Sequence, residues 1–267
     1  MRRSRGDSTK QRSTLVSPMD DSRWSRARKE RMVSRGLERT WDKRVDTWHD
    51  NVTTSDAFEG VREELISRAQ PRPTDACVDL GAGTGFLTLP LARMAASVFA
   101  VDISSRMIAE LDRLAGVHGL GNVDSMAGDL MSIELPEASV DLIVSNYTLH
   151  HLPHHEKRIL VGRARGWLRP GGRIVIADLM IGRNLSAENR GILTSKAKRL
   201  VAKGPGGIWR IVKALTKYGL QVGEERPASP QFWREALTHA GFVGVDHARV
   251  VNEAGVVWGM VPQTRGG

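Results

Sequence analysis

A glycine-rich turn that directly follows a short apolar run constrains the fold of this chain more than any other feature. Residues 76–86 read ACVDLGAGTGF. Glycine lets a backbone turn tightly and lets a ligand come close to it. A helix after such a turn presents free N–H groups to that ligand. The stretch therefore predicts a strand, a turn and a helix around a nucleotide-like ligand.

Strands and helices are then expected to alternate. Short apolar strands are predicted at 76–80, 97–101, 122–127, 140–146 and 173–179, with helices at 86–95, 106–117 and 155–167. Such alternation indicates parallel strands joined by crossover helices. A helix at 230–240 and an antiparallel pair at 243–250 and 256–261 complete the prediction. The expected fold is α/β, a Rossmann-like, seven-stranded, mostly parallel sheet with an antiparallel C-terminal strand pair.

Three further segments surround this predicted sheet. Residues 1–35 are polar and aperiodic, which predicts a basic disordered tail. Residues 36–70 are predicted to form an N-terminal helical cap, since Trp41, Val45 and Trp48 recur at helical spacing. The remaining part, 71–267, is expected to be the main domain, interrupted at 181–228 by a basic helical lid.

Basic charge is concentrated in two of these segments. The net charge is +9; residues 1–35 contribute +7 and residues 182–222 contribute +8, so the rest carries −6. Such segments can attract phosphate-rich partners or anionic membranes, although a solvated tail and solvated helix faces explain them equally well. The one cysteine, Cys77, excludes an internal disulfide and a cysteine-based zinc site, and no metal is expected. No apolar run reaches the ~20 residues of a membrane span, and a cytoplasmic location is expected.

Five spaced motifs resemble one family. The turn has the pattern Asp-x-Gly-x-Gly-x-Gly, unlike the dinucleotide fingerprint, and it lacks the Lys-Ser/Thr of a phosphate-binding loop. Asp102 ends the second strand, Gly128-Asp129-Leu130 the third and Asn146 the fourth, and LRPGG at 168–172 precedes the fifth. Together they resemble class I S-adenosylmethionine-dependent methyltransferases, in the type-11-like branch that acts on small molecules.

The resemblance implies a cofactor site for S-adenosylmethionine. Asp79 would orient the methionine amino end, Asp102 would hold the ribose hydroxyls, and Asp129 would receive the adenine amino group. For Asp129 a helix N-cap, and for the tryptophans plain helix packing, are the structural alternatives. The residues expected to bind the cofactor are Trp41, Trp48, Asp79, Gly81, Ala82, Gly83, Gly85, Asp102, Ile103, Met107, Gly128, Asp129, Leu130 and Asn146.

Two histidines after the fourth strand are the candidates for acid–base chemistry. Methyl transfer is an in-line displacement, and a hydroxyl acceptor benefits from a base that takes its proton. His150 or His151 suits that role because imidazole titrates near neutral pH. Asp178, at the end of the fifth strand, could orient one of them. The alternative is that one or both histidines only pack in the structure.

Three functions remain open. The first is methyl transfer to a small-molecule acceptor, by O-methylation with a histidine base or to carbon or nitrogen, and the basic lid would favour an anionic acceptor. The second is an RNA methyltransferase that uses the basic tail and lid. The third is a membrane-surface lipid methyltransferase, or a binding module that has lost catalysis. The sequence lacks the Pro-Pro motif of exocyclic-amine enzymes and a cysteine after the fourth strand for C5 chemistry. Neither the acceptor nor the oligomeric state follows from the sequence.

Overall fold

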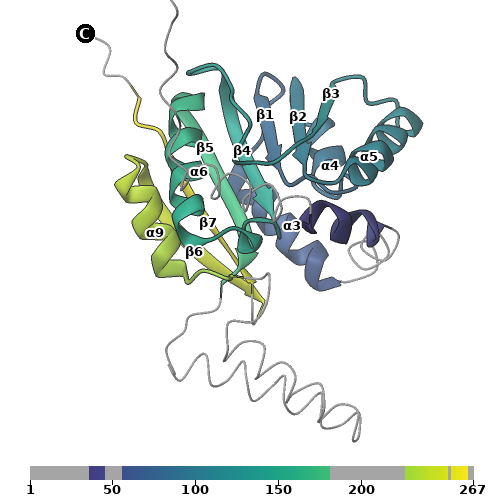
Figure 1. Cartoon of the computed structure of the whole chain (residues 1–267). Helices are drawn as coiled ribbons and strands as arrows, with labels where there is room; N and C mark the ends of the chain where they lie inside the picture. Colours follow the sequence, from purple (N-terminus) through teal and green to yellow (C-terminus); the bar gives the residue numbers. More distant parts are fainter. Residues whose placement is uncertain (1–35, 46–55, 181–225, 252–253, 264–267) are drawn as a thin grey trace, which may run out of the picture.

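The computed structural model describes residues 36–45, 56–180, 226–251 and 254–263. Residues 36–42 are helical (Figure 1). The predicted tail, Trp48 and almost all of the predicted lid lie outside the described residues. The elements that follow are α3 (Asp56–Ala69), β1 (Ala76–Leu80), α4 (Thr88–Ala92), β2 (Ser97–Asp102), α5 (Ser105–Val117), β3 (Val123–Ala127), β4 (Val140–Asn146), η1 (Leu149–His151), α6 (His154–Trp167), β5 (Leu168–Leu179), α9 (Pro230–His239), β6 (Val243–Val251) and β7 (Ala254–Met260).

The strands form one seven-stranded sheet in the order β3-β2-β1-β4-β5-β7-β6. The neighbours from β3 to β5 pair in parallel, and β7 pairs antiparallel with both β5 and β6. The predicted fold class, with its antiparallel C-terminal strands, is therefore confirmed. The chain goes outward from β1 to β3 and then returns to β4 on the other side of β1. Sheets of this kind bind ligands at the carboxyl ends of the strands, at this point of reversal.

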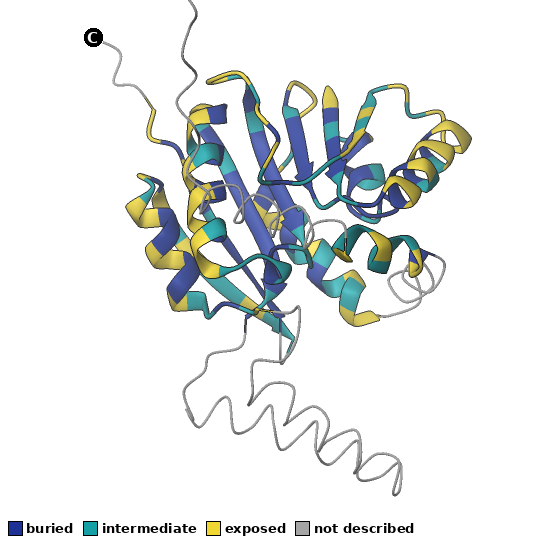
Figure 2. Cartoon of the chain, in the orientation of Figure 1, coloured by how far each residue is buried: buried dark blue, intermediate teal, exposed yellow. Residues whose placement is uncertain are grey.

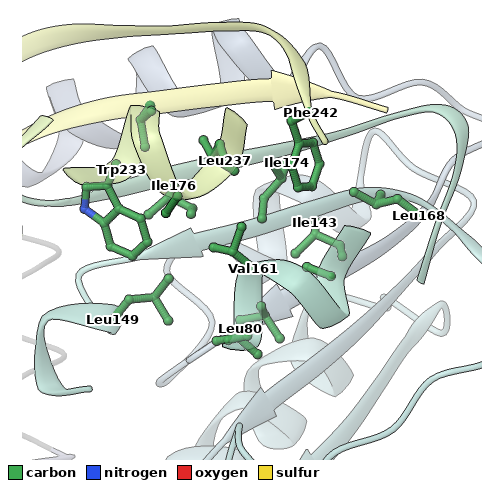
Figure 3. Close-up of a cluster of buried hydrophobic side chains, with 14 of the residues drawn as sticks. Leu80, Ile143, Leu149, Val161, Leu168, Ile174, Ile176, Trp233, Leu237 and Phe242 are labelled. Carbon is green, nitrogen blue, oxygen red and sulfur yellow. The ribbon is translucent and has the colours of Figure 1, made fainter. Parts of the chain in front are cut away.

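Helices cover both faces of the sheet (Figure 2). The first core lies under α6 and α9, where Val161, Trp233 and Leu237 pack on Ile143 and Ile176 (Figure 3). The second lies under α3 and α4, and α5 packs on Ala100 in a smaller cluster on β2. In β4, Leu142 and Val144 belong to one core and Ile143 to the other, as the alternation of a strand requires. A strand buried on both faces explains the apolar run Leu142–Val144 at its centre.

The strand β5 differs from its prediction at its start. Residues 169–172 were expected to form a turn before a strand from Arg173. In the structure β5 begins at Leu168, which pairs with Val140, and the next pair along is Leu142 with Arg173. The intervening residues bulge from the β4 register, and Gly171 and Gly172 exchange hydrogen bonds of 3.0 and 2.8 Å with Val261. The positive φ of Gly171, 78°, permits the bulge.

Candidate active site

The glycine turn wraps over the carboxyl end of β2. The N–H groups of Gly81 and Ala82 both donate to the Val101 carbonyl, at 2.7 and 3.0 Å. Gly81 and Gly85 have φ angles of +83° and +92°. A Cβ on Gly81 would lie 2.1 Å from the Thr148 side chain. The turn therefore requires glycine for its conformation and for its close approach to the end of β4.

Asp102 is held in place by the turn itself. Its Oδ2 accepts the Gly83 N–H at 2.9 Å, and its Oδ1 accepts the Ser104 N–H at the same distance. Burial raises the pKa of this carboxyl, and the two backbone hydrogen bonds oppose that shift. Each carboxylate oxygen can accept more than one hydrogen bond. The side chain is thus oriented while retaining lone pairs for two neighbouring hydroxyls.

Asp79 is a buried carboxyl, 1% exposed, beneath the turn. Its Oδ2 accepts the Thr88 hydroxyl at 2.7 Å, whereas its Oδ1 has no hydrogen-bond partner among the described residues. Burial raises the pKa of Asp79 to about 7, against the Thr88 hydrogen bond, which lowers it. A cationic group that came close would relieve this burial cost.

The predicted adenine side lies next to Asp102. The Gly128 N–H donates to the Asp102 carbonyl at 2.8 Å. Asp129 Oδ1 accepts the Met131 N–H at 2.9 Å in an Asx-type turn. No helix directly follows Asp129 among the described residues, so the helix N-cap considered for it is not what the structure shows. Met107 and Leu130 are buried, at 1% and 7% exposed. Ile103, between β2 and α5, is half-buried.

The end of β4 is strained and tied to the glycine turn. Tyr147 has a φ of +50°, which is uncommon for a residue other than glycine and concentrates at functional sites. The Thr148 hydroxyl donates to the carbonyls of Gly81 and Asn146, each at 3.1 Å. The buried Asn146 Oδ1 has no partner within the described ranges.

The two histidines occupy different environments. His150, 7% exposed, pairs through Nδ1 with Asp178 Oδ1 at 2.6 Å, and Asp178 is 1% exposed. Because the Leu179 N–H also donates to Asp178 Oδ1, the carboxyl group is fixed in orientation. His151 stacks on His150 with ring centroids 4.1 Å apart, and neither of its ring nitrogens has a partner in the described part of the chain. Burial lowers the pKa of His151 to about 3, and the ring is therefore neutral at pH 7.

The N-terminal helix reaches both sides of this edge. Trp41 makes an edge contact with the His151 ring at 5.3 Å. Asp42 accepts the Ser104 hydroxyl at 2.6 Å, and its carbonyl accepts Arg106 Nη1 at 2.5 Å. Trp41 therefore packs against the histidine side of the edge, while its neighbour contacts the side near Asp102.

Unpaired polar atoms converge on this edge of the sheet. Among the described residues, buried atoms without a hydrogen bond include Asp79 Oδ1, Asn146 Oδ1, Asp178 Oδ2 and both nitrogens of His151. The three side-chain oxygens lie in the last residues of the adjacent strands β1, β4 and β5, and His151 follows β4. Since unsatisfied buried polar groups are rare, their gathering indicates a polar ligand site. The polar groups of this site fit S-adenosylmethionine, since one carboxylate can meet its amino group and another its hydroxyls, beside the glycine turn.

Several residues of this site were not anticipated from the sequence. Thr88 holds Asp79, Thr148 links the two strand ends, and Ser104 caps α5 by accepting the Met107 N–H at 3.1 Å. A serine before a helical run is an N-cap signal that the sequence did contain. The roles of Thr88 and Thr148 depend on contacts between separate strands, for which no local signal exists.

The central part of the chain is similar in sequence to known methyltransferases. Residues 77–172 match a family described as "Methyltransferase domain". An uncharacterized methyltransferase of Anoxybacillus flavithermus is 33% identical over 123 residues, which are 46% of this chain and 55% of that protein. Phosphoethanolamine N-methyltransferase 1 of Arabidopsis thaliana is 31% identical over 144 residues, 53% of this chain and 29% of that protein. The matched region thus spans about half or less of these relatives.

A solved structure shares the fold. Phosphoethanolamine N-methyltransferase 1 of Haemonchus contortus, crystallised with phosphoethanolamine and S-adenosylhomocysteine, superposes with a TM-score of 0.60 at 18% identity. The superposition covers 88% of this chain and 50% of that one.

In the described ranges, no helix is long and apolar enough to cross a membrane.

Proposed function

We propose that the protein transfers a methyl group to the hydroxyl of a small-molecule acceptor. The premise is that residues 77–172 form a class I S-adenosylmethionine-dependent methyltransferase domain. The convergence of unpaired polar atoms at the ends of β1, β4 and β5 carries this proposal. The atoms of β1 and β4 lie at the reversal of the sheet, with the glycine turn and β2 on one side and β5 on the other.

Residues on the β1 and β2 side would bind the cofactor. Asp102, oriented by Gly83 and Ser104, would accept the ribose hydroxyls. Asp79 would face the positively charged amino end. Gly81 and Gly85 let the turn pack closely on the side chains of Thr148, Leu89 and Leu111, which a Cβ would meet. Asp129 and Leu130 would meet the adenine edge. When bound, S-adenosylmethionine supplies an electrophilic methyl group on a sulfonium.

Residues on the β4 and β5 side would prepare the acceptor. Asp178 would accept a hydrogen bond from the protonated Nδ1 of His150. The Nε2 of His150 would then keep its lone pair for the hydroxyl of the methyl acceptor. His150 would take the proton as the oxygen attacks the methyl carbon. His151, neutral and without a partner among the described residues, would bind the acceptor by a hydrogen bond rather than act as the base.

Methyl transfer from radiolabelled S-adenosylmethionine tests these assignments. The acceptors are a panel of phenols, catechols and aliphatic alcohols, with phosphoethanolamine included. With the best acceptor, His150→Ala is expected to lower turnover about 100-fold or more, within the range for general bases, and to leave the affinity for S-adenosylhomocysteine within twofold. His155→Ala, an exposed histidine one turn away, is the matched control. Unchanged turnover in both His150→Ala and His151→Ala would remove the histidine assignment.

An amine acceptor is the second candidate, because two of the relatives are phosphoethanolamine N-methyltransferases. Mass spectrometry of the methylated product separates the two, since O- and N-methyl products fragment differently. A purely N-methylated product would replace the hydroxyl acceptor by an amine.

RNA and membrane partners remain predictions, because the basic segments on which they depend lie outside the described residues. A fluorescence-anisotropy titration with a short RNA, repeated at rising salt, tests the first. The affinity should fall steeply with salt if RNA binds.

A further inference from the structure

A buried lysine beside the proposed acceptor site has no role in the chemistry described above. Lys157 lies in the first turns of α6 and is 0% exposed. Burial lowers its pKa to about 8, so that the amine still carries its proton at pH 7. A cation near a helix N-terminus also opposes the helix dipole. Two unfavourable effects at one position suggest that the ammonium group is retained for what it contacts.

Lys157 joins two segments that are far apart in the sequence. Its Nζ donates to the Leu152 carbonyl at 2.7 Å and to the Arg226 carbonyl at 2.5 Å. Leu152 caps η1, the short helix that holds both histidines. Arg226 lies four residues before Pro230, where α9 begins.

The Arg226 peptide is held from both sides. Its N–H donates to the His150 carbonyl at 2.5 Å, while its C=O accepts from Lys157. The backbone of His150 is therefore linked, through Arg226, to the buried ammonium group. Without Lys157, both the Leu152 and the Arg226 carbonyls would lose their charged donor.

The charges around Lys157 are consistent with this arrangement. Asp178 and Glu156 attract the ammonium group and raise its pKa, whereas Arg226 lowers it, and burial outweighs them all. Asp178 is also the partner of His150. The Asp178 carboxylate therefore interacts both with the Lys157 ammonium group and with His150, whose ring Asp178 orients.

We propose that Lys157 is a positioning residue that fixes the His150 loop against the chain segment at Arg226. The proposal rests on the proposed function for its catalytic meaning, but the contacts themselves do not depend on it. Lys157 acts on the reaction through His150 and touches no reacting atom.

Hydrogen–deuterium exchange with mass spectrometry tests this on the full-length protein. In Lys157→Met, which keeps an unbranched side chain, one atom shorter and without the charge, the amides of His151, Leu152 and Arg226 should exchange at least tenfold faster. Amides in β1 and β2 should be unchanged, and the affinity for S-adenosylhomocysteine should stay within twofold. The kcat of methyl transfer should fall at least tenfold while the KM for S-adenosylmethionine stays within twofold, because only the placement of His150 is disturbed. Arg158→Met, the exposed neighbour on α6, is the matched control and should leave all of these amides as in the wild type.

Equal protection of these three amides in Lys157→Met and wild type would overturn the proposal, as would a uniform acceleration over the whole chain. If Lys157→Met does not fold, Lys157→Gln, which keeps donor N–H groups, replaces it and should give a smaller acceleration confined to the same three amides. Failure of the wild type to bind S-adenosylhomocysteine would refute the proposed function instead, and would leave the exchange result as it stands.

Discussion

At the scale of single residues, the site is built from polar side chains whose burial carries a cost that a ligand can relieve. Asp79 is the clearest case, because its raised pKa of about 7 means that the carboxyl is partly protonated near neutral pH. An ammonium group held next to it would favour the ionised form. Binding of the ligand and loss of this proton are therefore linked.

We expect the affinity for S-adenosylhomocysteine to rise with pH up to about 7 and then to level off. At pH 6, binding should release close to one proton, since Asp79 is protonated in the free protein and ionised in the complex. Calorimetry in two buffers of different ionisation enthalpy measures this release. Asp79→Asn should bind more weakly and release no proton; the same release in that variant would assign it to another group.

The raised pKa of Asp79 also makes the stability of the folded protein depend on pH. A carboxyl whose pKa is raised in the folded state favours folding while protonated, and that contribution is lost as the pH rises from about 4 to about 7. Asp79→Asn should therefore melt at a higher temperature than the wild type at pH 8, and the difference should shrink toward pH 4. A gap between the two melting temperatures that is the same at both pH values would contradict this.

His151, like Asp79, is expected to contribute to activity while it lowers the stability of the folded protein. Both ring nitrogens are buried without a partner among the described residues, and each unsatisfied group costs about 1–3 kcal/mol. His151→Phe keeps a planar ring beside Trp41 and His150. We expect it to raise the free energy of unfolding by about 1 kcal/mol while lowering methyl transfer. A less stable variant would mean that the nitrogens are satisfied in solution.

At the scale of elements, the strands were predictable and their links were not. The ranges expected for the first, second and fourth strands agree with β1, β2 and β4 within one residue, because their apolar runs end at charged or polar residues. The helix expected at 86–95 is shorter, Thr88–Ala92, since turns flank it on both sides. The pairing of His150 with Asp178 was one of two options in the sequence, and only the β4–β5 register decides between them.

The attachment of α3 to the sheet depends on one arginine that local patterns do not reveal. From β5, Arg173 pairs with Asp75 at 2.6 Å and donates to the carbonyls of Ala69 and Gln70, which end the helix. Asp75 is 3% exposed. Removal of one member of a buried ion pair leaves the other without compensation.

Arg173→Met should therefore lower the free energy of unfolding by about 3–5 kcal/mol, measured by chemical denaturation. Arg113→Met, which breaks an exposed pair with Glu110 on α5, is the control and should have little effect. Equal stability of the two variants would show that α3 is held by its apolar face alone.

At the scale of the whole molecule, a single sheet carries a core on each face. Leu65 from α3 and Leu237 from α9 lie in the two separate cores, and both are 0% exposed. Because the central strands contribute side chains to both, damage to either core should weaken the entire domain. Leu65→Ala and Leu237→Ala should each cost about 2–5 kcal/mol in a single unfolding transition. A separate early transition in Leu65→Ala would mean that the cap unfolds independently.

We propose that the carboxyl edge of β1 and β2 binds S-adenosylmethionine through Asp102. Calorimetric titration of S-adenosylhomocysteine into wild type and Asp102→Ala measures what this carboxylate contributes to binding. Loss of charged hydrogen bonds worth about 1.5–3 kcal/mol should weaken binding roughly 10- to 100-fold. Equal affinity in the two proteins, or no binding to the wild type, would contradict the claim.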